Sequence, residues 1–346
     1  MMTGAREPAL QTLFSRAFPG ENGPIIAPAL YLALYVDPVH PDDVREFLGR
    51  SRQALGAHLR FYQTAGMKYP APTNDSRIAQ WLDRKLAPSK RLDIHTLILN
   101  ELGIDGVTPS DVRFDASSLR IEPLTESQQQ RDDYRGLAKL HGGGPLPAGA
   151  LLLAGFPLDH PLAEPGAFVA WVNALRAVTG GRLVYGSAGI ALSLAVEVHG
   201  QDSIDQHEIA QGLLARHPGL DLMPNFGQRV QWMNADGTVH PRIRRASWLN
   251  LLSQGVIDEL GGVATVEAGL AGTSARLHRL SAHAWLLQAS PMPRIGDVTI
   301  GDRVPEYSAV GRLLKPVRAE EFAGGDLSYS LDWLERWSSA LDGDQV

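Results

Sequence analysis

The sequence predicts an α+β protein in which mixed, largely antiparallel sheets pack against amphipathic helices. Three observations predict this class: segments with an apolar residue at every second position, segments with apolar residues at helical spacing, and a polar, Gly- and Pro-rich stretch between them. That stretch, residues 122–149, predicts a linker or long surface loop. We therefore expect two lobes, an N-terminal α+β lobe over residues 1–121 and a C-terminal α+β lobe over residues 150–346.

The N-terminal lobe should begin with a strand that leads into a helix. Residues 30–36 alternate Leu or Val with Tyr or Ala, which is the periodicity of a strand. Pro41 suits a first helical turn, and Asp42 and Asp43 complement a helix N-terminus. The apolar face of this helix would consist of Val44, Phe47, Leu48, Ser51 and Leu55.

The C-terminal lobe should open with a strand at residues 150–156 and a helix that ends at Gly180 and Gly181. A further strand is expected near Leu183. The apolar positions of the helix are Phe168, Trp171, Val172 and Leu175.

The strand-to-helix pattern then returns. Residues 192–198 alternate apolar and other side chains, and a helix is expected to begin at Ser203, which has the spacing of a capping box with Gln206. Ile209, Leu213 and Leu214 would supply its apolar positions.

The last third of the chain predicts a helix from about Ser247 to a stop at Gly261 and Gly262. Strands should follow at residues 277–280 and 283–288. The inward positions of the helix would be Trp248, Leu249, Leu252, Val256, Ile257 and Leu260, and a final helix would hold Leu331, Trp333, Leu334 and Trp337. We expect the tryptophans to be core anchors, because each ring buries a large area.

Composition favours a cytoplasmic protein that binds neither membranes nor nucleic acid directly. The chain has 346 residues and no cysteine, so it has no disulfides, which fits a reducing compartment. Charged residues interrupt the apolar runs near the N-terminus, and no run approaches the roughly 20 residues of a membrane span. The net charge of −6 disfavours nonspecific nucleic-acid binding and suits a basic protein partner.

A search for catalytic motifs predicts that the chain is not an enzyme and needs no cofactor. Residues 186–189 (Gly-Ser-Ala-Gly) lack the spacing of a nucleophile elbow. His207 and Glu208 have no second histidine one helical turn later, so the zinc-protease pattern is absent. Residues 141–145 (His-Gly-Gly-Gly-Pro) lack the Lys-Ser/Thr ending of a phosphate-binding loop. We therefore assign no catalytic, cofactor-binding or metal residue.

The last third of the sequence resembles a known family. The segments that carry the resemblance are residues 246–252 (Ala-Ser-Trp-Leu-Asn-Leu-Leu), 260–262, 287–291, 296–298, 305–307 and 314–318, together with 185–192 and 214–221. These segments are similar to the type VI secretion immunity family known as DUF3396 or TsiV. Ser290 departs from the pattern, because a glycine is expected there, and this puts the local turn geometry in doubt.

The resemblance implies a function that composition does not show. An immunity protein of this family is expected to bind and neutralise a co-encoded toxin effector, typically a DNase of restriction-endonuclease-like fold. Two other functions stay open: a hydrolase or nucleotide-modifying enzyme with an unrecognised site, and a chaperone that loads the effector for secretion. Protection of cells that express the toxin directly inside them separates immunity from loading.

Acidic positions at the start of the predicted second-lobe helix are the candidate contact with the effector. Asp202, Asp205 and Glu208 follow a strand directly, and Asp205 and Glu208 share a helical face distinct from that of Ile209 and Leu213. A nuclease presents basic residues to nucleic acid, so opposed charge would steer the encounter. A solvated helix face that complements the helix dipole explains the same residues equally simply.

Overall fold

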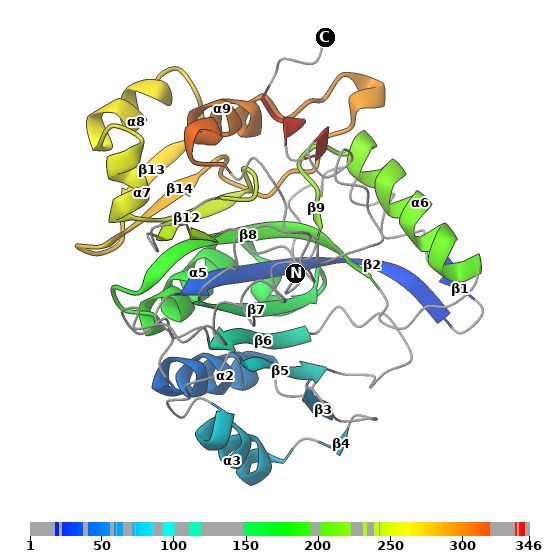
Figure 1. The fold of residues 1–346 in the computed structure, drawn as a ribbon. Coiled ribbons are helices and arrows are strands. Elements are labelled where there is room, and N and C mark those ends of the chain that lie inside the picture. The colour runs from blue at the N-terminus through cyan, green and yellow to red at the C-terminus, as the bar shows by residue number, and fades with distance from the viewer. Residues whose placement is uncertain are drawn as a thin grey trace, which may run out of the picture.

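A single extended sheet organises the molecule. The computed structural model describes residues 18–20, 23–36, 41–55, 59, 61–64, 71–72, 74–85, 93–100, 111–118, 149–194, 201–222, 231–233, 239–241, 243–318, 336–337 and 339–342. Twelve strands of these ranges form one sheet, in the order β13-β14-β12-β8-β2-β7-β6-β5-β3-β4, with β1 beside β2 and β9 beside β8 (Figure 1). All neighbours are antiparallel except β8 and β9.

The strands have the following bounds: β1 Phe18–Gly20, β2 Gly23–Val36, β3 Phe61–Thr64, β4 Ala71–Pro72, β5 Asp93–Asn100, β6 Asp111–Ser118, β7 Gly149–Pro157, β8 Leu183–Leu194, β9 Asp221–Leu222, β12 Leu249–Ser253, β13 Arg276–Arg279 and β14 Ala284–Gln288. A separate two-stranded antiparallel sheet pairs β10 (Gln231–Met233) with β11 (Val239–Pro241).

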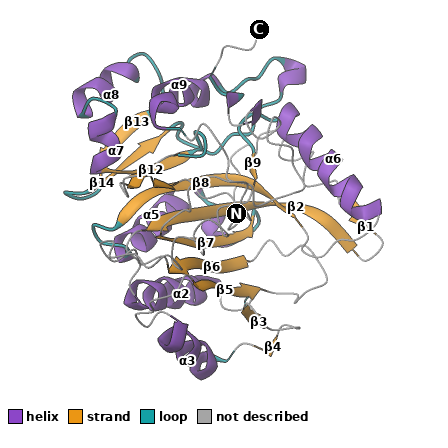
Figure 2. Cartoon of the chain, viewed as in Figure 1, coloured by secondary structure: helices purple, strands orange, loops and turns teal. Residues whose placement is uncertain are grey.

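Helices lie around this sheet, as Figure 2 shows. They are α2 Pro41–Leu55, α3 Asp75–Lys85, α5 Pro165–Val178, α6 Gln201–Arg216, α7 Gln254–Glu259, α8 Val263–Gly269 and α9 Pro305–Leu314, with short 3-10 turns η2 Pro161–Ala163, η3 Val298–Ile300 and η4 Lys315–Val317. The predicted α+β class with a largely antiparallel sheet is therefore confirmed.

Strand β2 lies at the centre of the sheet. Tyr31 pairs with Gly155 of β7 on one side and with Gly189 of β8 on the other. Every residue from Ala29 to Val36 is buried, which explains why both the Leu and the Tyr/Ala positions of this strand are apolar or aromatic. The predicted boundary at residues 122–149 thus separates segments that share one sheet. Residues 122–148 lie outside the described residues, and the division into two lobes stays a prediction.

Helices α2 and α5 match their predicted apolar faces. The five α2 positions and the four α5 positions are all buried. Glu164 caps the start of α5, where its Oε2 accepts a hydrogen bond of 2.7 Å from the Ala167 amide. Gly180 adopts a φ of +57°, as a helix stop requires. The Arg182 guanidinium and the Asp43 carboxylate then join the end of α5 to the start of α2.

The helix predicted from Ser247 is wrong in its first half. Residues Leu249–Ser253 form strand β12, which lies between β8 and β14. A central strand buries both faces, so its continuous apolar run is indistinguishable by periodicity from a buried helix. The helix begins only at Gln254, and Ser253 Oγ caps it by accepting from the Val256 amide at 3.4 Å. The predicted stop at Gly261 and Gly262 is confirmed by their φ values of +89° and +88°.

Other predicted boundaries shift by a few residues. Helix α6 begins at Gln201, so Ser203 lies inside it and the predicted capping box is wrong. Strand β8 ends at Leu194, and residues 195–200 lie outside the described residues. Trp337 is helical and buried, whereas Leu331, Trp333 and Leu334 fall outside the described ranges. No helix in the described part of the chain is long and apolar enough to cross a membrane.

Candidate functional site

The three acidic positions predicted to contact a partner all lie on α6. Glu208 is exposed, and nothing is described of the side chains of Asp202 and Asp205. The helix turns Ala210 and Leu214 into the core. Ile209 and Leu213, predicted as the apolar stripe, are only partly buried and pack at its margin. The outward face that carries Glu208 is thus separate from the buried face, as the spacing predicts.

The end of α6 is fastened to the segment that follows β14. His217 Nδ1 lies 2.6 Å from the Gly296 carbonyl oxygen, and the Gly219 amide donates to the Ile295 carbonyl at 2.8 Å. A side chain at Gly219 would overlap the Arg294 carbonyl oxygen, so only glycine permits this close approach. The end of helix α6 is therefore held in a fixed position against residues 294–297.

Asp297 is the centre of the tight loop that follows. Its carboxylate accepts hydrogen bonds from Arg216 Nη2 at 2.6 Å, from Thr299 Oγ1 at 2.6 Å and from the Thr299 amide at 2.9 Å. These donors, Arg216 first, hold the pKa of Asp297 well below its usual range. Asp297 and Asp302 also exchange two backbone hydrogen bonds of 2.9 and 3.0 Å, which close the base of the loop.

The far side of the loop is held by Arg294 and ends in a strained residue. The Arg294 guanidinium contacts Asp302 Oδ2 at 2.6 Å and Glu306 Oε1 at 2.7 Å. Gly296 has a φ of +68°, and a side chain there would meet the Asp302 carbonyl oxygen at 2.8 Å. Val304 has a φ of +44°, which is unfavourable for a β-branched residue. Strain of this kind persists only where the surrounding contacts determine the backbone conformation.

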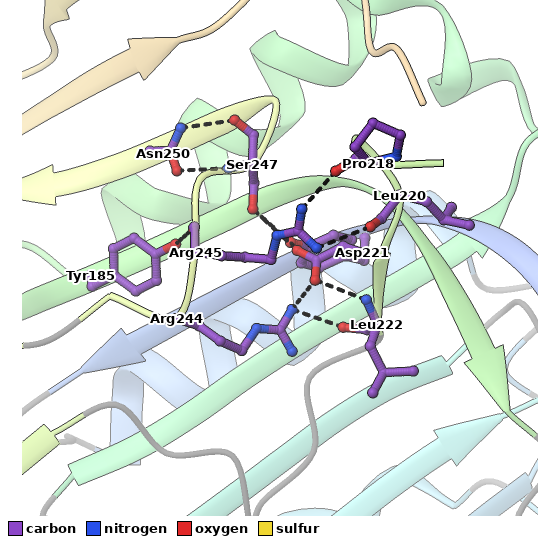
Figure 3. Close-up of polar contacts among 10 residues, drawn as sticks. Tyr185, Pro218, Leu220, Asp221, Leu222, Arg244, Arg245, Ser247 and Asn250 are labelled. Carbon is purple, nitrogen blue, oxygen red and sulfur yellow. Dashed lines mark hydrogen bonds and ion pairs between the residues drawn. The ribbon is translucent and has the colours of Figure 1, made fainter. Parts of the chain in front are cut away.

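A second polar cluster lies wholly inside the protein, next to the end of α6 (Figure 3). Asp221 is its acceptor: the carboxylate receives hydrogen bonds from Tyr31 Oη, from Arg244 Nη2 at 2.5 Å and from Ser247 Oγ at 3.1 Å. The Leu222 amide adds a fourth at 2.8 Å. Burial, followed by the Asp221 charge, raises the pKa of Tyr31 well above its ordinary value, so the phenol stays a donor.

Arg245 shares this interior, and none of the described carboxylates forms an ion pair with it. Its Nη2 donates to the Pro218 carbonyl at 2.6 Å, and its guanidinium lies 4.6 Å from the centre of the Trp337 ring. Burial lowers the pKa of Arg245 to about 10, which leaves it charged at neutral pH. We call the set of Tyr31, Asp221, Arg244, Arg245 and Ser247 the buried network; each of its side chains is sealed from solvent.

Trp248 and Ser290 have the structural roles that the motif residues suggest. The Trp248 ring stacks on Phe168 with centroids 5.5 Å apart, and its Nε1 donates to the Ser290 carbonyl at 2.8 Å. Ser290 stands where glycine was expected. Its Oγ donates to the Met292 carbonyl at 2.5 Å, and it does not adopt a positive φ, so the turn accommodates a side chain.

Sequence reasoning missed both polar clusters. Asp221, Ser247 and Asp297 all fall in the segments that carry the family resemblance, but their partners come from distant parts of the chain. The adjacent Arg244 and Arg245, directly before that motif, were the available signal. Among the described residues no group of three His, Asp or Glu side chains is placed to hold a metal ion.

Comparison with known proteins identifies the family. The family model TsiV, described as type VI immunity for VRR-NUC, matches residues 46–340, which is most of the chain. The fold is similar to that of the Pseudomonas aeruginosa T6SS protein PA0821, with a TM-score of 0.65 over 96% of this chain and 90% of the other at 17% identity. No curated protein is significantly similar to the chain. The match confirms the resemblance found in the sequence: the chain belongs to the TsiV family of type VI immunity proteins, whose partner is a VRR-NUC nuclease effector.

Proposed function

We propose that this chain neutralises its VRR-NUC effector by stoichiometric binding and catalyses no reaction itself. The observation that carries this proposal is the burial of three polar groups whose pKa values are shifted. Tyr31, Arg244 and Arg245 have shifted pKa values, yet each is sealed inside the buried network and donates to acceptors of the protein itself. Groups arranged in this way support the fold and have no access to a substrate.

The mode of inhibition that best fits the charge of the chain is occlusion of the nucleic-acid groove. A nuclease groove is basic, and this chain has a net charge of −6. Helix α6, with Glu208 exposed, is the surface we propose to meet that groove, with Asp202 and Asp205 as its other acidic positions. The cysteine-free composition suits the reducing cytoplasm, where an injected effector would be met.

A titration of nuclease activity tests the proposal. Purified immunity protein is added to a fixed amount of effector, and DNA cleavage is followed. If inhibition is stoichiometric, cleavage stops when one equivalent of immunity protein has been added per effector. We expect a Kd that is nanomolar or better, which corresponds to a binding free energy of roughly −12 kcal/mol. Inactivation of many effector molecules by one immunity protein would instead reveal an enzyme. Protection of cells that make the effector in their own cytoplasm separates immunity from loading.

The acidic surface of α6 has its own test. Reversing Asp205 and Glu208 to Lys should slow association, most strongly at low salt, because long-range attraction sets the encounter rate. The matched control reverses two acidic residues of α7 and α8, Asp258 and Glu267, both of which are exposed. Stopped-flow association at two salt concentrations gives the result. Equal association rates for the α6 and control variants would mean that the acidic residues of α6 form an ordinary solvated helix face and do not contact the effector.

A further inference from the structure

One large apolar side chain of the described residues is far more exposed than the fold requires. Ile300 is 79% exposed at the last position of η3, and Met292 follows at 48%. Among the residues whose side-chain burial is described, the other large apolar residues are buried or partly buried. A single exposed apolar residue is ordinary at a protein surface. What distinguishes Ile300 is its place at the tip of a loop whose backbone is held by hydrogen bonds.

The loop under Ile300 is rigid. We call residues 296–302 the braced loop. Asp297 and Asp302 close its base with two backbone hydrogen bonds, and the Ile300 amide donates to the Asp297 carbonyl at 3.2 Å. Gly301 ends the turn with a φ of +81°. The backbone that carries Ile300 is thus held in one conformation, which lowers the conformational entropy that binding would otherwise cost.

The braced loop is also fixed in relation to α6. Arg216, in the last turn of α6, donates to Asp297 with Nε and Nη2, at 3.0 and 2.6 Å from Oδ2. The His217 ring contacts the Gly296 carbonyl, so the last residue of α6 and the residue after it together hold the start of the loop. The apolar tip is therefore fixed relative to the C-terminal end of α6, about two helical turns beyond Glu208.

We propose that Ile300 is the apolar anchor of the effector interface and inserts into an apolar pocket of the VRR-NUC effector. This inference rests on the function proposed above. Tight protein interfaces combine a few buried anchors with a polar or charged rim. Net charge and α6 supply only the rim, because exposed charges steer the encounter but add little affinity. The braced loop, which is bonded to the end of the same helix, supplies the missing element, a preorganised apolar residue.

Replacement of Ile300 by Asp tests the anchor. We expect the Kd for purified effector, measured by interferometry, to rise about 30-fold or more, mainly through faster dissociation. Thermal unfolding should be unchanged, since Ile300 is exposed. Ile300→Leu should keep the affinity within about threefold, because a side chain of similar size still fills an apolar pocket.

The matched control is Ala282→Asp, which adds the same charge to another exposed turn. Ala282 lies between β13 and β14, at the opposite end of β14 from the braced loop. An unchanged Kd for Ile300→Asp, or an equal loss for Ala282→Asp, would overturn the anchor while the wild-type protein still inhibits at one equivalent. Failure of the wild-type protein to bind the effector would overturn the proposed function itself, and the anchor with it.

Discussion

The buried network around Asp221 and the braced loop around Asp297 use the same groups in different surroundings. Each has an aspartate held by an arginine and by a hydroxyl, Ser247 and Thr299 respectively. The Arg244 side chain is 2% exposed, whereas that of Arg216 is 43% exposed. An ion pair in the interior cannot be replaced by water, but one at the surface can. The pair of Arg244 and Asp221 therefore maintains the fold, whereas the pair of Arg216 and Asp297 positions a surface loop.

The largest expected effect comes from removing the apolar wall beside the buried network. Trp248→Ala should lower the free energy of unfolding by about 3–5 kcal/mol, because it leaves a cavity against Phe168 and removes one of the two side-chain hydrogen bonds to the Ser290 carbonyl. Urea denaturation measures the loss, and protection against the effector should fail with it. A variant that keeps its melting temperature but loses effector binding would make Trp248 an interface residue.

Asp221→Asn should lower the free energy of unfolding almost as strongly, because it disrupts the buried network. The change keeps the shape of the side chain but removes the buried ion pair between Arg244 and the Asp221 carboxylate, at a cost of about 3–5 kcal/mol. Denaturant unfolding with the Asp221→Asn protein gives the value. A loss below about 1 kcal/mol would mean that water reaches the buried network after all.

Arg216→Gln removes one charge from the other ion pair, that of Arg216 with Asp297, whose arginine is largely exposed. The unfolding free energy should fall by less than about 1 kcal/mol, since water replaces the exposed partner. Binding should suffer more than stability: a looser braced loop must be ordered on binding, which raises the Kd about threefold to tenfold. Calorimetry on the same samples gives both numbers. If stability falls as far as it does for Asp221→Asn, the two pairs are not different in kind.

The smallest effect is a pH dependence at Asp297. Its folded pKa lies below that of an unfolded aspartate, so its stabilisation is complete above about pH 4 and is lost as the pH falls through the folded pKa. Asp297→Asn removes this titration and should flatten the acid side of the stability curve. Unfolding midpoints between about pH 5 and about pH 2 measure it. Identical slopes for the two proteins would show that Asp297 is not the titrating group.

Local signals predicted much of the fold because their causes are local. The alternation at residues 30–36, the apolar face of α2 and the left-handed Gly180 follow from neighbouring residues alone. The sequence of strand β12 wrongly predicts a helix, because its continuous apolar run is explained only by the neighbouring strands β8 and β14. Periodicity carries no information about such neighbours.

The candidate site was predictable only in part for the same reason. The helical setting of Asp202, Asp205 and Glu208 was correct, because helix position is encoded within a few residues. The bond between Arg216 and Asp297 and the exposure of Ile300 depend on how α6 meets a segment from much later in the chain. No pattern within either segment reports that meeting.

The central place of β2 has a consequence for how this protein is made. Tyr31 leaves the ribosome early, but its partners Gly155 and Gly189 are synthesised only much later. A nascent chain must therefore hold an apolar strand unpaired until β7 and β8 emerge, and such non-local pairing is slow and exposed to aggregation. Because such folding is slow, a cell under attack depends on immunity protein that it folded beforehand.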